Sequence, residues 1–149
     1  MRLHASIYEP GNPYGSSPWR QEHGALWGIG PHALSVLLPV LGTVTEVRAV
    51  RGRDDEVELI TKHDSGAIGS ISVSLTSPPK DRSSEWTIFG SEETFALPDS
   101  DEPPVIAYRN MIDDLLAVRT APWSHPCDVH FGRAVSHVLA DAERSLRTG

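Results

Sequence analysis

Apolar and polar residues alternate in several short segments of the chain, which is the pattern of strands with one buried face. In the first segment, residues 2–9, Leu3 and Ile7 share one face and His4 lies on the other. Similar segments predict further strands at residues 43–51, 56–62, 67–76, 85–89 and 94–97. Polar turns separate most of these strands, as at residues 63–66. Strands joined by such turns favour a mainly antiparallel sheet.

Longer segments carry apolar residues at the spacing of a helix. The first is residues 24–42, and its apolar stripe consists of Leu34, Leu37, Leu38 and Leu41. His32 falls on the opposite side of the helical wheel. The pair Gly30-Pro31 is typical of a helix start, because the N–H that proline lacks has no helical partner at the first position. Further helices are expected at residues 106–118 and 128–147.

Strands flanked by helices predict an α+β fold, with an open, mainly antiparallel β-sheet and helices packed on one face. A length of 149 residues fits a single domain, residues 1–149. An open sheet face leaves apolar residues in need of cover, so we expect a homo-oligomer, most simply a dimer through that face. The apolar residues concerned are Val57, Leu59, Ile71 and Val73.

Charge and composition narrow the possible partners. The net charge of −7, with scattered Lys and Arg, argues against a nucleic-acid partner and against an anionic membrane surface. No apolar run approaches the roughly 20 residues that span a bilayer, and the first residues do not resemble a signal peptide. The one cysteine, Cys127, excludes an internal disulfide and fits a reducing compartment. These features predict a cytoplasmic protein.

The start of the first helical segment resembles the start of the C-terminal domain of the Gfo/Idh/MocA oxidoreductases. That family's pattern is roughly Gly-Gly-Ala-Leu-x-Asp-x-Gly-x-His, followed by an apolar helix. The matching residues here are Gly24, Ala25, Leu26, Gly30 and His32. Gly28 stands at the position of the family's Asp. The resemblance continues through residues 12–14, 17–20 and 125–147. The family's N-terminal Rossmann half, with its Gly-rich loop and its Glu-Lys-Pro motif, has no counterpart in the sequence.

The resemblance implies a catalytic role for His32. In the family, the Asp and His of the motif lie beside the substrate and assist proton transfer while a nicotinamide takes or gives hydride. Of that pair only His32 is present here, and imidazole is the commonest general acid or base near neutral pH. Its place in the first helical turn disfavours the charged form. The alternative is a hydrogen-bonded histidine with a structural role.

Other polar and aromatic residues flank this helix or precede the last one. The candidates for binding a polar or anionic small molecule are Tyr14, Arg20, His23, Trp27 and His125. The alternative is that Trp27 packs in the core and that Arg20 lies on the surface. His130 and His137 are two helical turns apart, too far for paired metal ligation, so we expect no metal. Without a Gly-rich phosphate loop, we expect the chain to hold no cofactor.

These observations predict a stand-alone small-molecule enzyme that performs cofactor-independent acid/base chemistry with His32, such as cyclisation, isomerisation or elimination. A first alternative is the substrate-binding and oligomerisation half of an NAD(P)-dependent oxidoreductase whose Rossmann half is on another chain or was removed. A second alternative is an inactive scaffold kept for its sheet interface.

Overall fold

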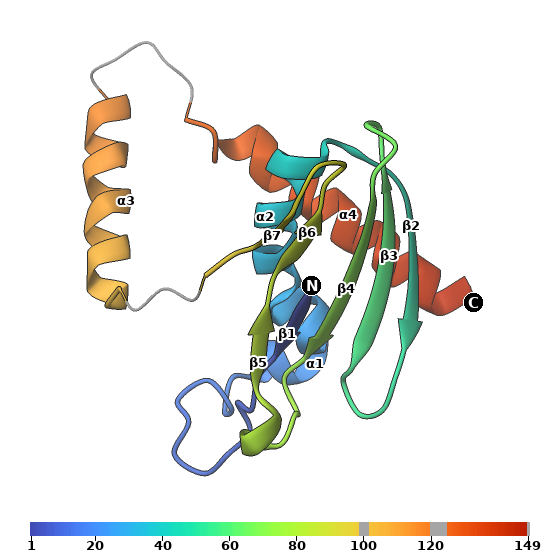
Figure 1. Ribbon diagram of the computed structural model, residues 1–149. Helices are drawn as coiled ribbons and strands as arrows, with labels where there is room; N and C mark the ends of the chain where they lie inside the picture. The colour runs from blue at the N-terminus through green and yellow to red at the C-terminus, as the bar shows by residue number, and fades with distance from the viewer. Residues whose placement is uncertain (99–101, 120–124, 149) are drawn as a thin grey trace.

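A computed structural model describes residues 1–98, 102–119 and 125–148. The elements follow in the order β1 (Arg2–His4), α1 (Pro18–Gly28), α2 (Gly30–Leu41), β2 (Val44–Arg51), β3 (Val57–His63), β4 (Ile68–Ser74), η1 (Pro79–Asp81), β5 (Ser83–Glu85), β6 (Thr87–Phe89), β7 (Thr94–Ala96), α3 (Pro104–Val118) and α4 (Val129–Thr148). Strands β2, β3, β4, β1 and β5 form a five-stranded sheet in that order. Helices α1, α2 and α4 pack on one face of this sheet (Figure 1). Neighbouring strands are antiparallel except β1 and β4, which are parallel. The predicted α+β fold is confirmed.

The core lies between the sheet and these helices. Every second residue of β3 is buried, and the residues between them are exposed. The buried residues are Val57, Leu59, Thr61 and His63. From the helices, the predicted apolar stripes supply Leu34 and Leu37 of α2 and Val135 and Leu139 of α4. Each fully buried aliphatic side chain of this kind contributes about 1.5–3 kcal/mol, so the core is the main source of stability.

The apolar residues for which we expected a second subunit are already covered within the chain. The register pairs Val57 with Val73 and Leu59 with Ile71, and all four side chains are at most 2% exposed beneath the helices. The assignment of these four residues to the open face was therefore wrong, whereas the expected homo-oligomer stays a prediction. The exposed apolar side chains of the face opposite to the helices are Val50, Ile60 and Ile68.

The segment at residues 24–42 is not one helix but the end of α1 followed by α2. Ile29 separates the two helices with φ −132°. Gly24 interrupts α1 with φ 60° and ψ −160°, a conformation that glycine adopts easily because it has no Cβ. The predicted helix start at Gly30-Pro31 is confirmed, because α2 begins at Gly30.

The two helices together form an apolar stretch. By length and composition alone, Pro18–Leu41 is suited to crossing a membrane, which a count of uninterrupted apolar residues does not detect. In the structure this stretch is bent at Gly24 and at Ile29. Its buried residues, such as Leu26 and Leu34, belong to the core beside the sheet.

The edge of the sheet at β1 differs from the prediction. The first strand ends at His4 rather than at residue 9, and beyond it Ser6 forms an isolated bridge with Thr76. Strand β5 pairs with β1 and sets Ser83 opposite His4. The short segment of β5 has no alternating pattern, so it was not predicted. The hairpin of β6 and β7 falls within the predicted strands at residues 85–89 and 94–97.

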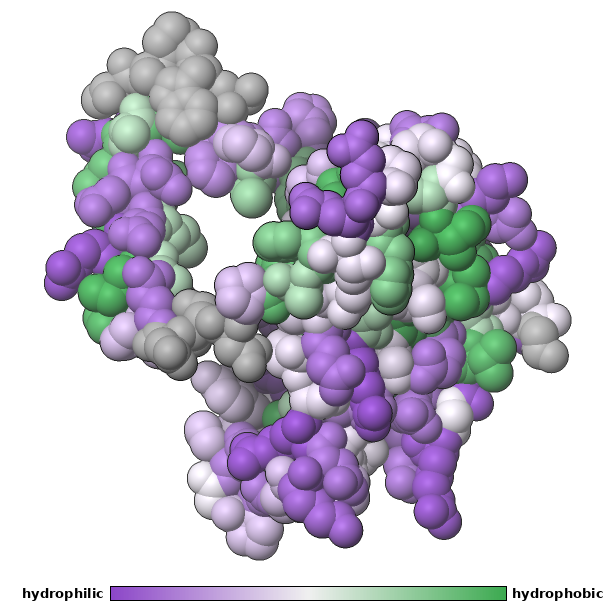
Figure 2. All heavy atoms as spheres, in the orientation of Figure 1, coloured by the Kyte–Doolittle hydropathy of each residue, from purple (hydrophilic) through white to green (hydrophobic). Residues whose placement is uncertain are grey.

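Helix α3 stands apart from the rest of the molecule (Figure 1). It contains the predicted helix at residues 106–118, and none of its residues is buried. Its exposed large apolar side chains are Val105, Tyr108, Met111, Ile112, Leu115 and Leu116. Figure 2 shows an opening between α3 and the rest of the molecule.

Candidate small-molecule site

A cavity of about 400 Å³ lies where the start of α2 meets the sheet edge formed by β1 and β5. Its lining residues are Leu3, His4, Ala5, Ile29, His32, Ser83, Ser84 and Trp86. The volume is within the range of about 300–1,000 Å³ that small-molecule sites occupy. Because His32 is the residue that the sequence motif singles out, this cavity is the candidate site.

His32 lies in the first turn of α2, where its side chain is exposed while those of Leu34 and Leu37 are buried. The backbone N–H of His32 donates a hydrogen bond to the carbonyl oxygen of Ile29 at 3.0 Å. The hydroxyl of Ser35 donates to the carbonyl oxygen of His32 at 2.7 Å. These bonds hold the backbone. An exposed imidazole on the wall of a cavity can reach a bound ligand, which is what proton transfer requires.

His4 also lines the cavity, but unlike His32 its side chain is buried and hydrogen-bonded. Its Nδ1 lies 3.0 Å from the hydroxyl of Ser77 and 3.3 Å from the guanidinium of Arg2. Because a guanidinium can only donate, Nδ1 accepts. The proton therefore sits on Nε2, which donates to the hydroxyl of Ser72 at 2.7 Å.

The environment of His4 favours the neutral ring. Burial lowers the pKa of His4 below its usual value of 6.5, and the positive charge of Arg2 lowers it further. Glu56, whose carboxylate is 4.0 Å from Nε2, acts in the other direction but less strongly. With both ring nitrogens engaged, His4 is suited to shaping the cavity, and His32 is the imidazole that can exchange a proton with a ligand.

Trp86 completes the cavity on the β5 side. Its indole Nε1–H donates to the hydroxyl of Ser84 at 2.9 Å, so a hydrogen bond restrains the orientation of the ring. Neither His4 nor Trp86 was predicted as a site residue. The alternating pattern of the first strand puts His4 on the polar face. No local pattern shows that Trp86 shares a cavity with His32, because β5 pairs with β1 from far along the chain.

The sequence candidates upstream of α2 form pairs of their own. The guanidinium of Arg20 lies 4.9 Å from the centre of the Tyr14 ring, a cation–π distance. The ring of His23 lies 5.0 Å from that of Trp19. Tyr14, Arg20 and His23 are not among the residues that line the cavity of His32. Their roles in binding remain predictions.

Trp27 is partly buried and packs against the core, which is the alternative raised from the sequence. It does not line the cavity of His32 either. The geometry therefore brings His32, but not Trp27, to the candidate site.

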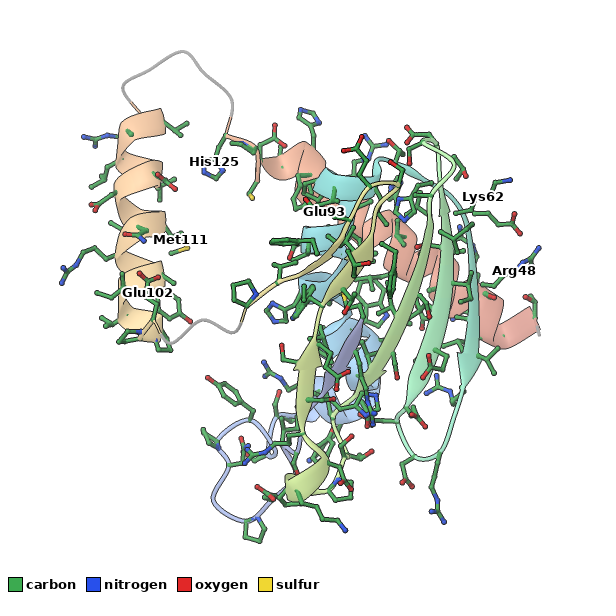
Figure 3. The ribbon with its side chains drawn as sticks, viewed as in Figure 1. Arg48, Lys62, Glu93, Glu102, Met111 and His125 are labelled. Carbon is green, nitrogen blue, oxygen red and sulfur yellow. The ribbon has the colours of Figure 1, made fainter. Side chains whose placement is uncertain are left out.

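His125 lies on the segment that leads into α4. Its Nδ1 accepts a hydrogen bond from the backbone N–H of Cys127 at 3.0 Å, and its Nε2 is 3.5 Å from the carboxylate of Asp114 in α3. Figure 3 shows its ring between this segment and α3. His125 thus joins α3 to the chain before α4. Within the described residues, no group of three or more His, Cys, Asp or Glu side chains could hold a metal ion.

Solved structures of two dehydrogenases and one oxidoreductase share this fold. The WlbA dehydrogenase from Bordetella pertussis, solved in complex with NADH and UDP-GlcNAcA, is 22% identical with a TM-score of 0.69 and is matched over 99% of this chain and 52% of its own. The WlbA dehydrogenase from Chromobacterium violaceum, solved with the same two ligands, is 19% identical with a TM-score of 0.71 over 98% and 51%. An oxidoreductase from Thermotoga maritima is 14% identical with a TM-score of 0.67 over 97% and 50%.

The chain therefore spans about half the length of these proteins. No curated protein matches it. The sequence pattern of the GFO/IDH/MocA C-terminal domain matches residues 1–96. Since that match covers more than half of the 149 residues and the fold agrees, the chain belongs to the GFO/IDH/MocA C-terminal domain family.

Proposed function

We propose that this chain is the substrate-binding half of an NAD(P)-dependent oxidoreductase, and that His32 is its proton-transfer residue. The observation that carries the proposal is the position of His32 on the wall of the cavity of about 400 Å³ at the start of α2. The family membership and the half-length match to dehydrogenases support the same function.

The chain's own residues do not fit a dinucleotide. A pyrophosphate is usually held at a helix N-terminus after a strand and a Gly-rich loop. In the described part of the chain, no helix begins at such a loop. The hydride acceptor therefore belongs to a half that this chain does not supply, and the chain contributes the substrate side.

On the substrate side, His32 can take the proton of a hydroxyl group as that group is oxidised, or return it when a carbonyl is reduced. The neutral His4 ring and the indole of Trp86 form less polar parts of the wall. A site that is apolar on one side and carries an imidazole on the other orients a hydroxylated molecule.

For the substrate, we propose a hydroxylated, anionic small molecule. The support is that two dehydrogenases with this fold were solved with UDP-GlcNAcA, which carries hydroxyls, a carboxylate and phosphates. Arg20 above the Tyr14 ring offers a cation for such a ligand at the outer side of α1.

The test is calorimetric binding of UDP-GlcNAcA to the chain, to His32→Ala and to a control, His130→Ala, which changes an exposed histidine of α4. Loss of a ligand hydrogen bond at His32 should weaken binding about 5- to 10-fold, and the control should bind like the wild type. Equal binding by all three proteins contradicts the role of His32. Conversion of the ligand by the chain alone, without a dinucleotide, supports the cofactor-independent enzyme instead.

For assembly, we propose a homo-oligomer through the open sheet face. Support comes from Ile60, at 48% exposure on β3, with Val50 and Ile68 on the strands β2 and β4 beside it. Ile60→Lys places a charge among these three apolar side chains, so it should reduce the mass measured by light scattering. The control, Glu58→Lys, changes an already polar position of the same strand and should leave the mass unchanged.

The cytoplasm remains the proposed location.

A further inference from the structure

A cavity of about 210 Å³ lies between β4 and β6, beside Met1 at the start of β1. Residues 67–70 line it on one side and residues 87–89 on the other, and Leu37 and Leu41 of α2 line it from the helical layer. In Figure 1, β4 extends past the start of β1, and β6 continues the line of β5. The cavity therefore lies where a longer β1 would run.

The pairing of β1 with its two neighbours defines positions inside this cavity. Arg2 is level with Ser72 of β4 and with Glu85 of β5. A strand that continued β1 beyond Met1 in this register would pass between three pairs of residues. These pairs are Ser70 with Thr87, Gly69 with Ile88, and Ile68 with Phe89. All six residues line the cavity, so the register and the cavity define the same place.

The edge of β4 that borders the cavity has no partner strand among the described residues. The amino group of Met1 donates a hydrogen bond to the carbonyl oxygen of Ser70, and the N–H of Ser72 donates to the carbonyl oxygen of Met1, both at 3.0 Å. Successive residues of a strand direct their backbone groups to opposite edges, so the even-numbered residues of β4 face β1. The N–H of Ser70 and both backbone groups of Ile68 therefore point into the cavity, beyond the end of β1.

Strand β6 borders the cavity with a second free edge. The N–H of Leu97 donates to the carbonyl oxygen of Trp86 at 3.0 Å, so the even-numbered residues of this segment face β7. Thr87 and Phe89 direct their backbone groups to the other edge, which in β5 pairs with β1. In the described part of the chain, no strand pairs with β6 on that side. Two unpaired strand edges thus face one cavity from opposite sides.

We infer that an extended segment of a second polypeptide binds in this cavity as a strand between β4 and β6. The segment runs parallel to β4 and antiparallel to β6, as β1 runs beside β4 and β5. Strand addition satisfies the backbone groups of both edges at once. A small apolar ligand would fill the volume but leave both edges unpaired, so the occupant is a polypeptide.

The surroundings of the three positions set the side chains that the segment carries. The side chain at the middle position lies on the helical face of the sheet, toward Leu37 and Leu41. The side chain farthest from Met1 lies on the open face, between Ile68 and Phe89, which are 62% and 80% exposed. The side chain nearest to Met1 lies beside a serine and a threonine. The segment therefore carries two adjacent apolar residues followed by a polar one.

The probe is the hexapeptide Lys-Thr-Thr-Val-Val-Thr with an N-terminal fluorescein and an amidated C-terminus, whose last three residues suit these positions. Fluorescence anisotropy, measured without nucleotide or substrate, should show saturable binding to the full chain below about 1 mM. The same peptide with N-methylated valines keeps its side chains but loses two backbone donors, so it should bind at least about 10-fold more weakly. Equal binding of the two peptides assigns the cavity to apolar ligands and overturns the inference, as does the absence of saturable binding.

A pair of matched variants locates the binding edge. Thr87→Pro removes an N–H that faces the cavity and should weaken binding of the first peptide about 10-fold. Thr94→Pro is the control, because Thr94 lies opposite Phe89 and its N–H points to the far edge of β7. Circular dichroism should show both variants folded, since neither N–H takes part in the pairing of β6 with β7.

Equal binding of the peptide by Thr87→Pro and by the wild type contradicts the inference. The comparison of the two peptides on the wild type does not depend on how these variants fold. The inference does not use the proposed function, so His32→Ala should bind the peptide as the wild type does. Failure of the chain to bind UDP-GlcNAcA would therefore leave the strand site standing, and failure to bind the peptide would leave the role of His32 standing.

Discussion

The Nδ1 atom of His63 lies 2.8 Å from the carbonyl oxygen of Gly42. Because a carbonyl only accepts, the ring donates from Nδ1, and its Nε2 can accept from the hydroxyl of Thr61 at 3.0 Å. Gly42 is the residue that ends α2, and His63 is the last residue of β3. The buried imidazole of His63 therefore connects the end of α2, the helix that carries His32, to strand β3 by a hydrogen bond.

Replacing this imidazole should destabilise the fold. His63→Ala leaves a void and removes the partner of the Gly42 carbonyl, so the free energy of unfolding should fall by about 2–4 kcal/mol. Urea denaturation measures this change. The exposed His137 of α4 provides the control, since His137→Ala should change stability by less than about 0.5 kcal/mol. Equal effects of the two substitutions would show that the bond to Gly42 contributes nothing.

Stability should fall in mild acid because of His4. Its folded pKa is lowered, so between the usual value of 6.5 and that lower pKa the unfolded chain binds more protons than the folded one. The contribution is fully present above the unfolded pKa and is lost as the pH falls toward the folded one. Urea denaturation at about pH 7.5 and about pH 5.5 should show this loss in the wild type and a smaller one in His4→Gln. A pH dependence that is the same in both proteins assigns it to another group.

Gly28→Asp, which restores the family residue, should crowd the core. A Cβ at Gly28 would lie 2.8 Å from Cδ1 of Leu75, which is 1% exposed. We expect a loss of about 1–3 kcal/mol from overpacking. Gly132→Asp is the matched control, because a Cβ there meets nothing within 4 Å. Thermal unfolding compares the two, and a variant at Gly28 as stable as the wild type would contradict the contact.

Asp55 should matter more than its neighbour Asp54. Its carboxylate accepts hydrogen bonds from the backbone N–H groups of Leu75 and Thr76 at 3.1 and 3.2 Å, and from the hydroxyls of Ser74 and Thr76 at 3.0 and 2.7 Å. Asp55→Asn weakens these charge-assisted bonds and should cost about 1.5–3 kcal/mol in urea denaturation. Asp54 has φ 56°, which asparagine tolerates, so Asp54→Asn should be close to neutral. The reverse order of effects would refute this assignment.

The chain alone should not bind NADH tightly, because its described helices lack the loop that cradles a pyrophosphate. Calorimetry with NADH should show no micromolar binding. The matched measurement is UDP-GlcNAcA under the same conditions, for which the proposed function predicts binding. Micromolar affinity for NADH would mean that the chain holds the dinucleotide after all.

Local patterns in the sequence determined the strands β3 and β4, the buried stripes of α2 and α4, and the place of His32 in the first turn of α2. They did so because a period of two or of 3.6 residues reports which side chains meet the core, and because Pro31 at a helix start acts on its own backbone. Tertiary structure alone decided that β5 pairs with β1, that His4 and Trp86 therefore share a cavity with His32, and that Gly28 lies against Leu75. It also decided that Val57 and Ile71 face the helices while the apolar side chains of α3 stay exposed. The physical reason is that a periodic pattern shows that a face is apolar, whereas the surface that covers it comes from residues distant in sequence.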